Sequence, residues 1–315
     1  MHKNITSQLS DIRHAIGKLN DAGVYSILAS AKVNLTLDVL KKTESGYHEI
    51  QSVVHEIPSL FDVITFEKAI NHVNSTEVNS SDQAGNNQNV TFFSTNPLLK
   101  FNENNTLVKA IKLFEEKFDK RVYGHFSITK NIPMCSGLGG GSSDAAAALK
   151  ILVSAYGVNC CTVDTGNITD VERCHAPRCV LFEIARLIGM DVSFFINGGT
   201  QLSTHFGEVL TPLNSAAEFL DCAVIQTGVE TFTEDAYKSL NLFNCGFNIH
   251  KTDFFIEALK YGDTTKMLDS LHNDFDLVES MVENDQTDNH ANTENFLRTL
   301  LAGSGGARVR IFAVN

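Results

Sequence analysis

The stretch "PMCSGLGGGSSDAAAAL", from Pro133 to Leu149, constrains the fold more than any other part of this 315-residue chain. Glycine occupies four of the five positions from Gly137 to Gly141, and an alanine-rich run of strong helix formers follows. Glycine lets a backbone turn and approach a ligand closely, and a helix N-terminus presents unpaired N–H groups. The stretch therefore predicts a phosphate-binding loop that leads into a helix, with an ordinary glycine-rich connection as the alternative.

The common nucleotide-binding patterns do not fit this loop. The P-loop pattern needs Gly-Lys followed by Ser or Thr, but the Gly17–Lys18 pair precedes Leu19. The dinucleotide fingerprint G-x-G-x-x-G is met at Gly137 and Gly139 but has Ser142 in its third place. Protein-kinase signatures are also absent from the sequence. A glycine-rich loop before a helix N-terminus is the pattern that remains.

Composition limits the class of protein and its partners. A net charge of −12 disfavours nonspecific binding to nucleic acid or anionic membrane, although a nest of backbone amides can still bind a phosphorylated small molecule. The sequence has no apolar run of the roughly 18 residues that a membrane span needs, and its polar N-terminus does not resemble a secretory signal. Seven cysteines without such a signal favour a reducing compartment. We expect a bacterial cytoplasmic protein, or an organellar stromal one in a eukaryote, with a small-molecule ligand.

Periodicity and turn residues predict a mixed chain. Strands are expected at 25–40, 63–68, 90–93, from 124, and at 221–229, with turns and strands over 191–213. Helices are expected at 105–118, 143–156, 181–189, 252–262 and 264–282. Thr106 is the expected cap of the first helix, and residues 71–105 are expected to form a hairpin with long polar loops. We expect an N-terminal extension over 1–24, a first domain over 25–205 and a second over 206–315.

Several stretches together resemble the GHMP small-molecule kinases. "PMCSGLGGGSSDAA" looks like their second motif. "ASAKVNLTLDVLKKTESGYHEIQSVVHEI" and "IGMDVSFFINGGTQLSTHFGEVLTPL" resemble the A-K-x-N-L, D-G-Y-H-x-L-Q and G-A-D-V-P-F-F elements of one branch, the 4-diphosphocytidyl-2-C-methyl-D-erythritol kinases. "LHNDFDLV" and "LAGSGGARVRIFAV" are similar to that branch's later N-D and G-S-G elements. The resemblance covers most of Tyr25 to Phe312.

The resemblance implies an α+β fold with two domains, an N-terminal nucleotide-binding α/β domain and a C-terminal ferredoxin-like domain. It also implies transfer of a phosphoryl group from ATP, with Mg²⁺, to the tertiary hydroxyl of 4-diphosphocytidyl-2-C-methyl-D-erythritol, on the methylerythritol phosphate route to isoprenoid precursors. The implied ATP-binding residues are Pro133, Gly137, Leu138, Gly139, Gly140, Gly141, Ser142 and Ser143. Ser143 is also the candidate Mg²⁺ ligand.

The same resemblance assigns catalysis to Lys32 and Asp191. From residue types alone, Lys32 is a strand residue with its ammonium in solvent, and Asp191 is a turn or cap residue. On the family's pattern, Asp191 would accept the proton of the substrate hydroxyl, and Lys32 would orient it and offset charge on the phosphoryl group. Asn34 lies two residues beyond Lys32 on the same strand face and would fix the substrate alcohol.

Tyr47 and His48 are the candidate base-binding residues. A tyrosine can stack on a base, and an imidazole can hydrogen-bond to a pyrimidine edge. Taken alone, the pair indicates a hairpin tip with a surface aromatic and a solvated histidine. With the resemblance, the pair indicates a pocket for the cytidine of the substrate.

Cysteines and a histidine gather between residues 160 and 179 and raise the question of zinc. The residues are Cys160, Cys161, Cys174, His175 and Cys179. Their spacing is not a pair of C-x-x-C elements, and adjacent cysteines chelate one tetrahedral ion poorly. A packed or unstructured insertion is favoured over a zinc site.

Departures from the family pattern keep two alternatives open. Met190 and Ser193 replace the family's small residue and proline, and extra residues follow "GSGG". The sequence stops at Asn315, where the family continues into another helix, so the second domain is expected to be shortened. One alternative is a GHMP kinase with a different alcohol substrate, and the other is a catalytically inactive nucleotide-binding relative.

Overall fold

The computed structural model describes residues 17–18, 23–44, 46–69, 89–160, 179–225, 233–277 and 297–314. The chain divides into two compact units that interleave along the sequence. Unit 1 contains Met1–Ser30, Pro58–Ile132 and Gly140–Asn197, and unit 2 contains Ala31–Ile57, Pro133–Gly139 and Gly198–Asn315. The expected division at residues 205 and 206 stays a prediction. Most of the expected extension over 1–24 lies outside the described residues.

Two long strands carry the chain from one unit into the other. They are β2 (Val24–Lys42) and β3 (His48–Lys68), and the short β1 (Gly17–Lys18) pairs antiparallel with β2. Burial alternates at the start of β2 and then becomes continuous from residue 29 to residue 39. Continuous burial is typical of a strand that is covered on both faces, so this part of β2 is core. The predicted strands at 25–40 and 63–68 are confirmed and are longer than expected.

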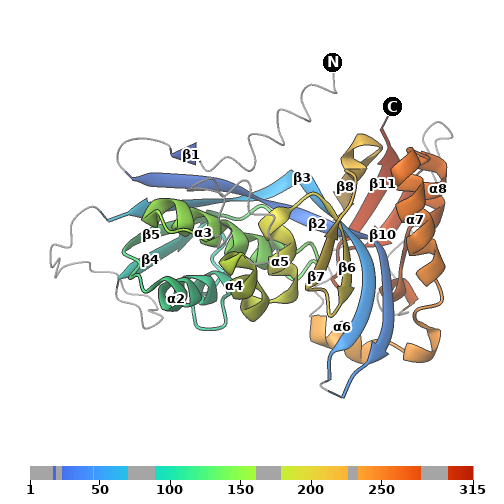
Figure 1. Ribbon diagram of the computed structural model, residues 1–315, viewed down its shortest axis with the longest axis horizontal. Helices are drawn as coiled ribbons and strands as arrows, with labels where there is room; N and C mark the ends of the chain where they lie inside the picture. Colours follow the sequence, from blue (N-terminus) through green and yellow to red (C-terminus); the bar gives the residue numbers. More distant parts are fainter. Residues whose placement is uncertain are drawn as a thin grey trace. The chain divides into compact units, whose positions relative to one another are not determined.

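Unit 1 has helices packed beside a small set of strands (Figure 1). The second half of β3 pairs antiparallel with β5 (Gly124–Thr129), and β5 pairs in parallel with β4 (Val90–Ser94). Among the described residues, the partner of β4 comes later in the chain, and residues 71–88 of the expected hairpin lie outside the described residues. The helices are α2 (Thr106–Phe118), α3 (Gly140–Tyr156), α4 (Val180–Ile188) and α5 (Met190–Asn197).

Unit 2 has strands paired with the first half of β3 and a separate antiparallel sheet. β6 (Thr200–His205) pairs with β3, β7 (Val209–Pro212) pairs with β6, and β9 (His272–Asn273) pairs in parallel with β2. The separate sheet has the order β10 (Leu297–Leu301), β11 (Arg308–Ala313) and β8 (Leu220–Ile225). The helices are α6 (Thr233–Ser239), α7 (Ile249–Tyr261) and α8 (Thr264–Ser270), with short 3₁₀ turns η2 (Ala216–Glu218), η3 (Leu242–Asn244) and η4 (Asp274–Leu277). α7 packs against α8, which contacts β11 (Figure 1).

Several helix boundaries differ from the expected ones. α3 begins at Gly140 rather than Ser143, and α8 ends at Ser270 rather than continuing to 282. Residues 190–197 form α5 where turns and strands were expected, because a short apolar run does not distinguish a strand from a buried helix. Among the described residues, no helix combines the length and apolar character needed to cross a bilayer.

The N-cap of α2 is Asn105 and not the expected Thr106. Asn105 Oδ1 accepts hydrogen bonds from Leu107 N at 2.9 Å and Val108 N at 3.4 Å, while Asn105 Nδ2 donates to Lys100 O at 2.8 Å. Thr106 Oγ1 instead donates to Gly141 O at 2.6 Å. Both side chains can cap a helix, so the sequence does not decide between them.

Asn105→Ala should lower the free energy of unfolding by about 1 kcal/mol, because two helix N–H groups lose their acceptor. Urea unfolding followed by circular dichroism would measure the change. Asn104→Ala is the matched control, since Asn104 is exposed and outside the helix. Equal stabilities of the two variants would contradict the assigned cap.

Candidate active site

A buried polar chain joins Lys32 to β3. Lys32 Nζ donates to Asn34 Oδ1 at 2.8 Å, Asn34 Nδ2 donates to Ser52 Oγ at 2.7 Å, and Ser52 Oγ donates to Thr36 O at 2.6 Å. The side chains of Lys32 and Asn34 are buried. The expected common strand face is confirmed, but the expected solvent-exposed ammonium is wrong. An ammonium held by a fixed amide in a buried site is preorganised to meet negative charge.

The glycine loop lies directly on the turn between β10 and β11. A Cβ on Gly137 would fall 1.7 Å from Ala302 O, and a Cβ on Gly305 would fall 2.0 Å from Gly137 N. Ala307 N donates to Ser136 O at 3.2 Å, which ties the turn to the loop. Neither Gly137 nor Gly305 can carry a side chain in this arrangement.

The same turn and loop surround the Lys32 ammonium. Lys32 N donates to Leu138 O at 3.0 Å, which joins β2 to the glycine loop. A Cβ on Gly303 would lie 3.0 Å from Lys32 Nζ, 3.2 Å from Asn34 Oδ1 and 3.2 Å from Gly137 O. Unit 2 therefore brings the A-K-x-N, glycine-loop and G-S-G stretches together around one lysine.

The start of α3 provides the geometry that an anion needs. Gly137 and Gly139 have φ of +80° and +76°, whereas Gly140 and Gly141 are the first residues of the helix. The opening N–H groups of a helix have no intrahelical acceptor, so they can bind phosphate. Ser142 is half-buried and Ser143 is buried in this first turn. The first turn of α3 therefore offers N–H groups whose hydrogen bonds an anion can accept.

The first residues of α3 also include Asp144, which pairs with a buried lysine. Lys130 Nζ pairs with Asp62 Oδ2 and, at 2.9 Å, with Asp144 Oδ2 of α3. Burial raises the pKa of Asp144 to about 7, although the charge of Lys130 opposes the shift. Burial alone would lower the pKa of Lys130, but Asp144 and Asp62 outweigh it and raise that pKa. Asp144 is thus held by Lys130 inside unit 1.

Asp191 occupies the first turn of α5, after Gly189. Its side chain is exposed, whereas Val192 and Phe194 on the same helix are buried. An exposed carboxylate at a helix start can reach a solvent-borne substrate. Lys32 belongs to unit 2 and Asp191 to unit 1. The pairing that the resemblance implies between them stays a prediction.

Tyr47 and His48 each meet another aromatic ring of unit 2. Tyr47 is 56% exposed, and its ring centroid lies 5.6 Å from that of Phe206. The His48 ring stacks on Tyr237 of α6 with centroids 4.7 Å apart. Burial, and then the charge of Lys42, lowers the pKa of His48, so the ring is a neutral imidazole with one donor and one acceptor. His48 is the first residue of β3 and is partly exposed, so its ring contacts Tyr237 while remaining accessible.

Several residues of these sites carried no clear sequence signal. Tyr237 lies outside the stretches that carried the resemblance. Ser52, Phe206, Asn273 and Gly303 lie inside them, but nothing in the sequence indicated a role for these four residues. Their positions follow from pairing between distant segments.

The described residues give no support to a zinc site. They contain no group of three or more His, Cys, Asp or Glu side chains that could hold a metal ion. Cys160 is a free thiol, whereas Cys179 is disulfide-bonded and so offers no thiolate. Cys161, Cys174 and His175 lie outside the described residues.

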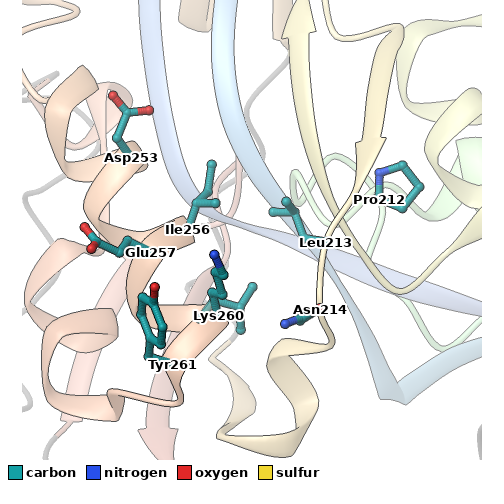
Figure 2. Close-up of a pocket in the computed structure, with 9 residues that line it drawn as sticks. Pro212, Leu213, Asn214, Asp253, Ile256, Glu257, Lys260 and Tyr261 are labelled. Carbon is teal, nitrogen blue, oxygen red and sulfur yellow. The ribbon is translucent and has the colours of Figure 1, made fainter.

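A separate pocket of about 610 Å³ lies in unit 2 between α7 and the segment after β7 (Figure 2). Asp253, Glu257 and Lys260 project from α7, and Leu213 lies across from them (Figure 2). None of the predicted site residues lines this pocket.

Known proteins resemble the chain in sequence and fold. The family model for the N-terminal domain of GHMP kinases matches residues 105–199. The chain is 34% identical to the 4-diphosphocytidyl-2-C-methyl-D-erythritol kinase of Caldanaerobacter subterraneus subsp. tengcongensis, over 81% of this chain and 75% of the relative. It is 32% identical to the kinase of the same name from Caldicellulosiruptor saccharolyticus, over 90% of this chain and 87% of the relative.

Solved structures agree with these sequence matches. A crystal structure of 4-(cytidine 5'-diphospho)-2C-methyl-D-erythritol kinase superimposes with a TM-score of 0.59 at 25% identity, covering 90% of this chain and 89% of that one. A homoserine kinase from Cytophaga hutchinsonii has the same TM-score of 0.59 at 15% identity, covering 94% of this chain and 87% of that one, and so shows the fold alone. The expected α+β class with two domains is confirmed.

Gly137→Ala should destabilise the protein far more than Gly157→Ala. Both glycines have positive φ, which costs an alanine about 1–2 kcal/mol, but a Cβ on Gly157 meets nothing within 4 Å. A Cβ on Gly137 overlaps Ala302 O, so the loop and the turn must separate. Urea unfolding of both variants would measure the difference, and similar losses would contradict the loop–turn contact.

Proposed function

The chain belongs to the 4-diphosphocytidyl-2-C-methyl-D-erythritol kinase family of GHMP kinases, and we propose that it performs that family's reaction. It transfers the γ-phosphoryl group of ATP to the tertiary hydroxyl of 4-diphosphocytidyl-2-C-methyl-D-erythritol, in the methylerythritol phosphate route to isoprenoid precursors. The observation that carries the proposal from the structure is the buried Lys32–Asn34 pair, enclosed by the glycine loop and the turn at Gly303.

Lys32 and Asp191 are the proposed catalytic residues. Phosphoryl transfer depends on positioned phosphates, charge stabilisation and an oriented nucleophile. Asp191 accepts the proton of the attacking hydroxyl, and its exposure suits access to the substrate. The Lys32 ammonium offsets negative charge on the transferring group, and Asn34 orients the substrate alcohol. The fixed hydrogen bond between Lys32 and Asn34 supports placing both groups at the reacting atoms.

The proposed ATP phosphate site comprises the glycine loop and the first turn of α3. Its residues are Pro133, Gly137, Leu138, Gly139, Gly140, Gly141, Ser142 and Ser143. Backbone N–H groups would bind the phosphates, so the site needs no cluster of basic side chains. This mode of binding is compatible with the net charge of −12.

Mg²⁺ is proposed to accompany ATP rather than to occupy a protein cage. Mg²⁺ usually keeps several waters and binds through substrate phosphates with one or two protein ligands. Ser143 is the proposed protein ligand. When bound, the ion would neutralise charge on the phosphates.

The cytidine is proposed to bind at Tyr47 and His48. The exposed Tyr47 ring offers a face for stacking, and Phe206 beside it extends the apolar surface. The neutral His48 imidazole can donate one hydrogen bond and accept another, which suits the mixed edge of cytosine. Stacking on Tyr237 limits rotation of that imidazole.

We further infer a cytoplasmic location, with small molecules as partners and neither nucleic acid nor membrane. The relatives are bacterial enzymes, and the net charge of −12 disfavours anionic surfaces. A GHMP kinase with another alcohol substrate is disfavoured by the names of the relatives. A catalytically inactive relative is disfavoured by the buried, hydrogen-bonded Lys32–Asn34 pair.

An assay of purified protein with ATP, Mg²⁺ and the cytidylyl substrate tests the proposal. We expect turnover of that substrate and not of homoserine or mevalonate. Binding of ATP without turnover of any of the three alcohols would indicate the inactive alternative. Faster turnover of homoserine or mevalonate would indicate a different GHMP kinase.

Asp191→Asn should lower kcat by about 10²–10⁴-fold, because an amide cannot accept the proton. ATP affinity, measured by calorimetry, should stay near the wild-type value. Glu116→Gln is the control, since Glu116 is an exposed acid on α2 with no assigned role. A wild-type kcat in Asp191→Asn would remove Asp191 from catalysis.

Tyr47→Ala and His48→Ala should each raise KM for the cytidylyl substrate by about 10- to 100-fold, because a stacked face or a hydrogen bond is lost. KM for ATP should change little. The uridine analogue of the substrate should lose as much with wild-type enzyme, since the exocyclic donor becomes an acceptor. Phe93→Ala is the control, because Phe93 is 56% exposed like Tyr47 but lies on β4. Equal use of both nucleotides would contradict the base site.

A further inference from the structure

Asn273 uses all of its side-chain hydrogen-bonding groups to hold the turn after β10. Asn273 Nδ2 donates to Leu301 O at 2.9 Å and to Gly303 O at 2.8 Å. Its Oδ1 accepts from Phe275 N at 3.0 Å. The side chain is 5% exposed, so water cannot readily replace these bonds. The side-chain amide of Asn273 therefore fixes both Leu301, at the end of β10, and Gly303, which lies beside Lys32.

The turn that Asn273 holds forms one wall around the lysine. Gly303 has φ of +54°, and its backbone is so close that a Cβ would lie 3.0 Å from Lys32 Nζ. Gly305, two residues further along the turn, contacts the Gly137 backbone, so the position of the glycine loop also depends on the turn. A small shift of Gly303 changes the space that the Lys32 ammonium and the loop can occupy.

Asn273 is itself anchored to the strand that carries Lys32. β9 pairs in parallel with β2, with Leu37 opposite Asn273. On either side, His272 Nε2 hydrogen-bonds to Asp38 Oδ2 at 2.9 Å and Asp274 Oδ2 accepts from Val39 N at 2.8 Å. β2 therefore carries Lys32 itself and, through its pairing with Asn273, also positions the turn at Gly303 beside that lysine.

We propose that Asn273 is a positioning residue for phosphoryl transfer, acting through Gly303 on Lys32 and on the glycine loop. Asn273 is not among the residues proposed above to bind the nucleotide or the alcohol. Its contribution is to keep the Lys32 ammonium and the Gly137 backbone in one arrangement. The kinetic consequence rests on the proposed kinase function, whereas the structural consequence does not.

Asn273→Asp gives the sharpest test. The carboxylate keeps the size of the side chain and the acceptor for Phe275 N, but it cannot donate to Leu301 O or Gly303 O. We expect kcat to fall at least about tenfold, equivalent to about 1.4 kcal/mol. KM for the cytidylyl substrate should stay within about threefold, since its proposed base site lies elsewhere. A merely structural role would lower stability without this split between kcat and KM.

Thr252→Val is the matched control. Thr252 is fully buried, and its Oγ1 donates to Thr36 Oγ1 at 2.9 Å and is bonded to Asp38 Oδ2 at 3.1 Å, so it belongs to the same network. Neither of these hydrogen bonds reaches the turn. We expect Thr252→Val to lower the unfolding temperature while leaving kcat within about twofold.

Hydrogen exchange measured by mass spectrometry tests the structural part of the proposal without relying on kinase activity. Peptides covering 133–139 and 301–307 should exchange faster in Asn273→Asp than in wild type, and not in Thr252→Val. Wild-type exchange and wild-type kcat in a folded Asn273→Asp would overturn the proposal. If the wild-type protein shows no kinase activity, the proposed function fails and the exchange result alone decides this inference.

Gly303→Ala decides the question if Asn273→Asp does not fold. The added methyl lies 3.0 Å from Lys32 Nζ and leaves the Asn273 side chain in place. We expect the same loss of kcat with a small change in KM. A wild-type kcat in Gly303→Ala would show that the turn does not control the lysine.

Discussion

The contact between two glycine backbones, Gly137 and Gly305, is the constraint on which the arrangement of unit 2 depends. A Cβ on either residue would overlap backbone atoms of the other segment, at 1.7 Å from Ala302 O or 2.0 Å from Gly137 N. Because no side chain separates the segments, the hydrogen bond from Ala307 N to Ser136 O can form. The loop, the turn and β2 thus become one hydrogen-bonded set around Lys32.

Lys32 and Lys130 both have buried side chains, but different segments of the chain surround them. Lys130 lies between Asp62 and Asp144, so its charge is balanced within unit 1. Lys32 donates to the neutral amide oxygen of Asn34 in unit 2. The glycine loop and the turn at Gly303 border the Lys32 ammonium, whereas two carboxylates pair with Lys130. The backbone segments around Lys32 are those of the candidate site, so Lys32 is the proposed cation for a phosphoryl group.

Local patterns predicted part of this structure, and long-range pairing decided the rest. The shared face of Lys32 and Asn34 follows from the two-residue period of a strand, and the helix after the glycine loop follows from its alanines. Asn273 was not predictable in its role, because its carbonyl partners lie 28 and 30 residues away in sequence. Tyr237 was missed because stacking on His48 depends on how α6 packs. The site roles of Asp191, Tyr47 and His48 stay predictions.

The glycines of the opening motif divide by their physical role, and this division refines what the motif means. Gly137 is required by its contact with the turn, whether or not a ligand binds. Gly139 is required by its φ of +76°, and Gly140 by Ile132, which a Cβ would approach to 3.0 Å. A glycine-rich sequence therefore does not by itself indicate phosphate binding, since packing alone explains much of it. What packing leaves unexplained is the set of N–H groups that opens α3, and the nucleotide-binding proposal depends on those groups.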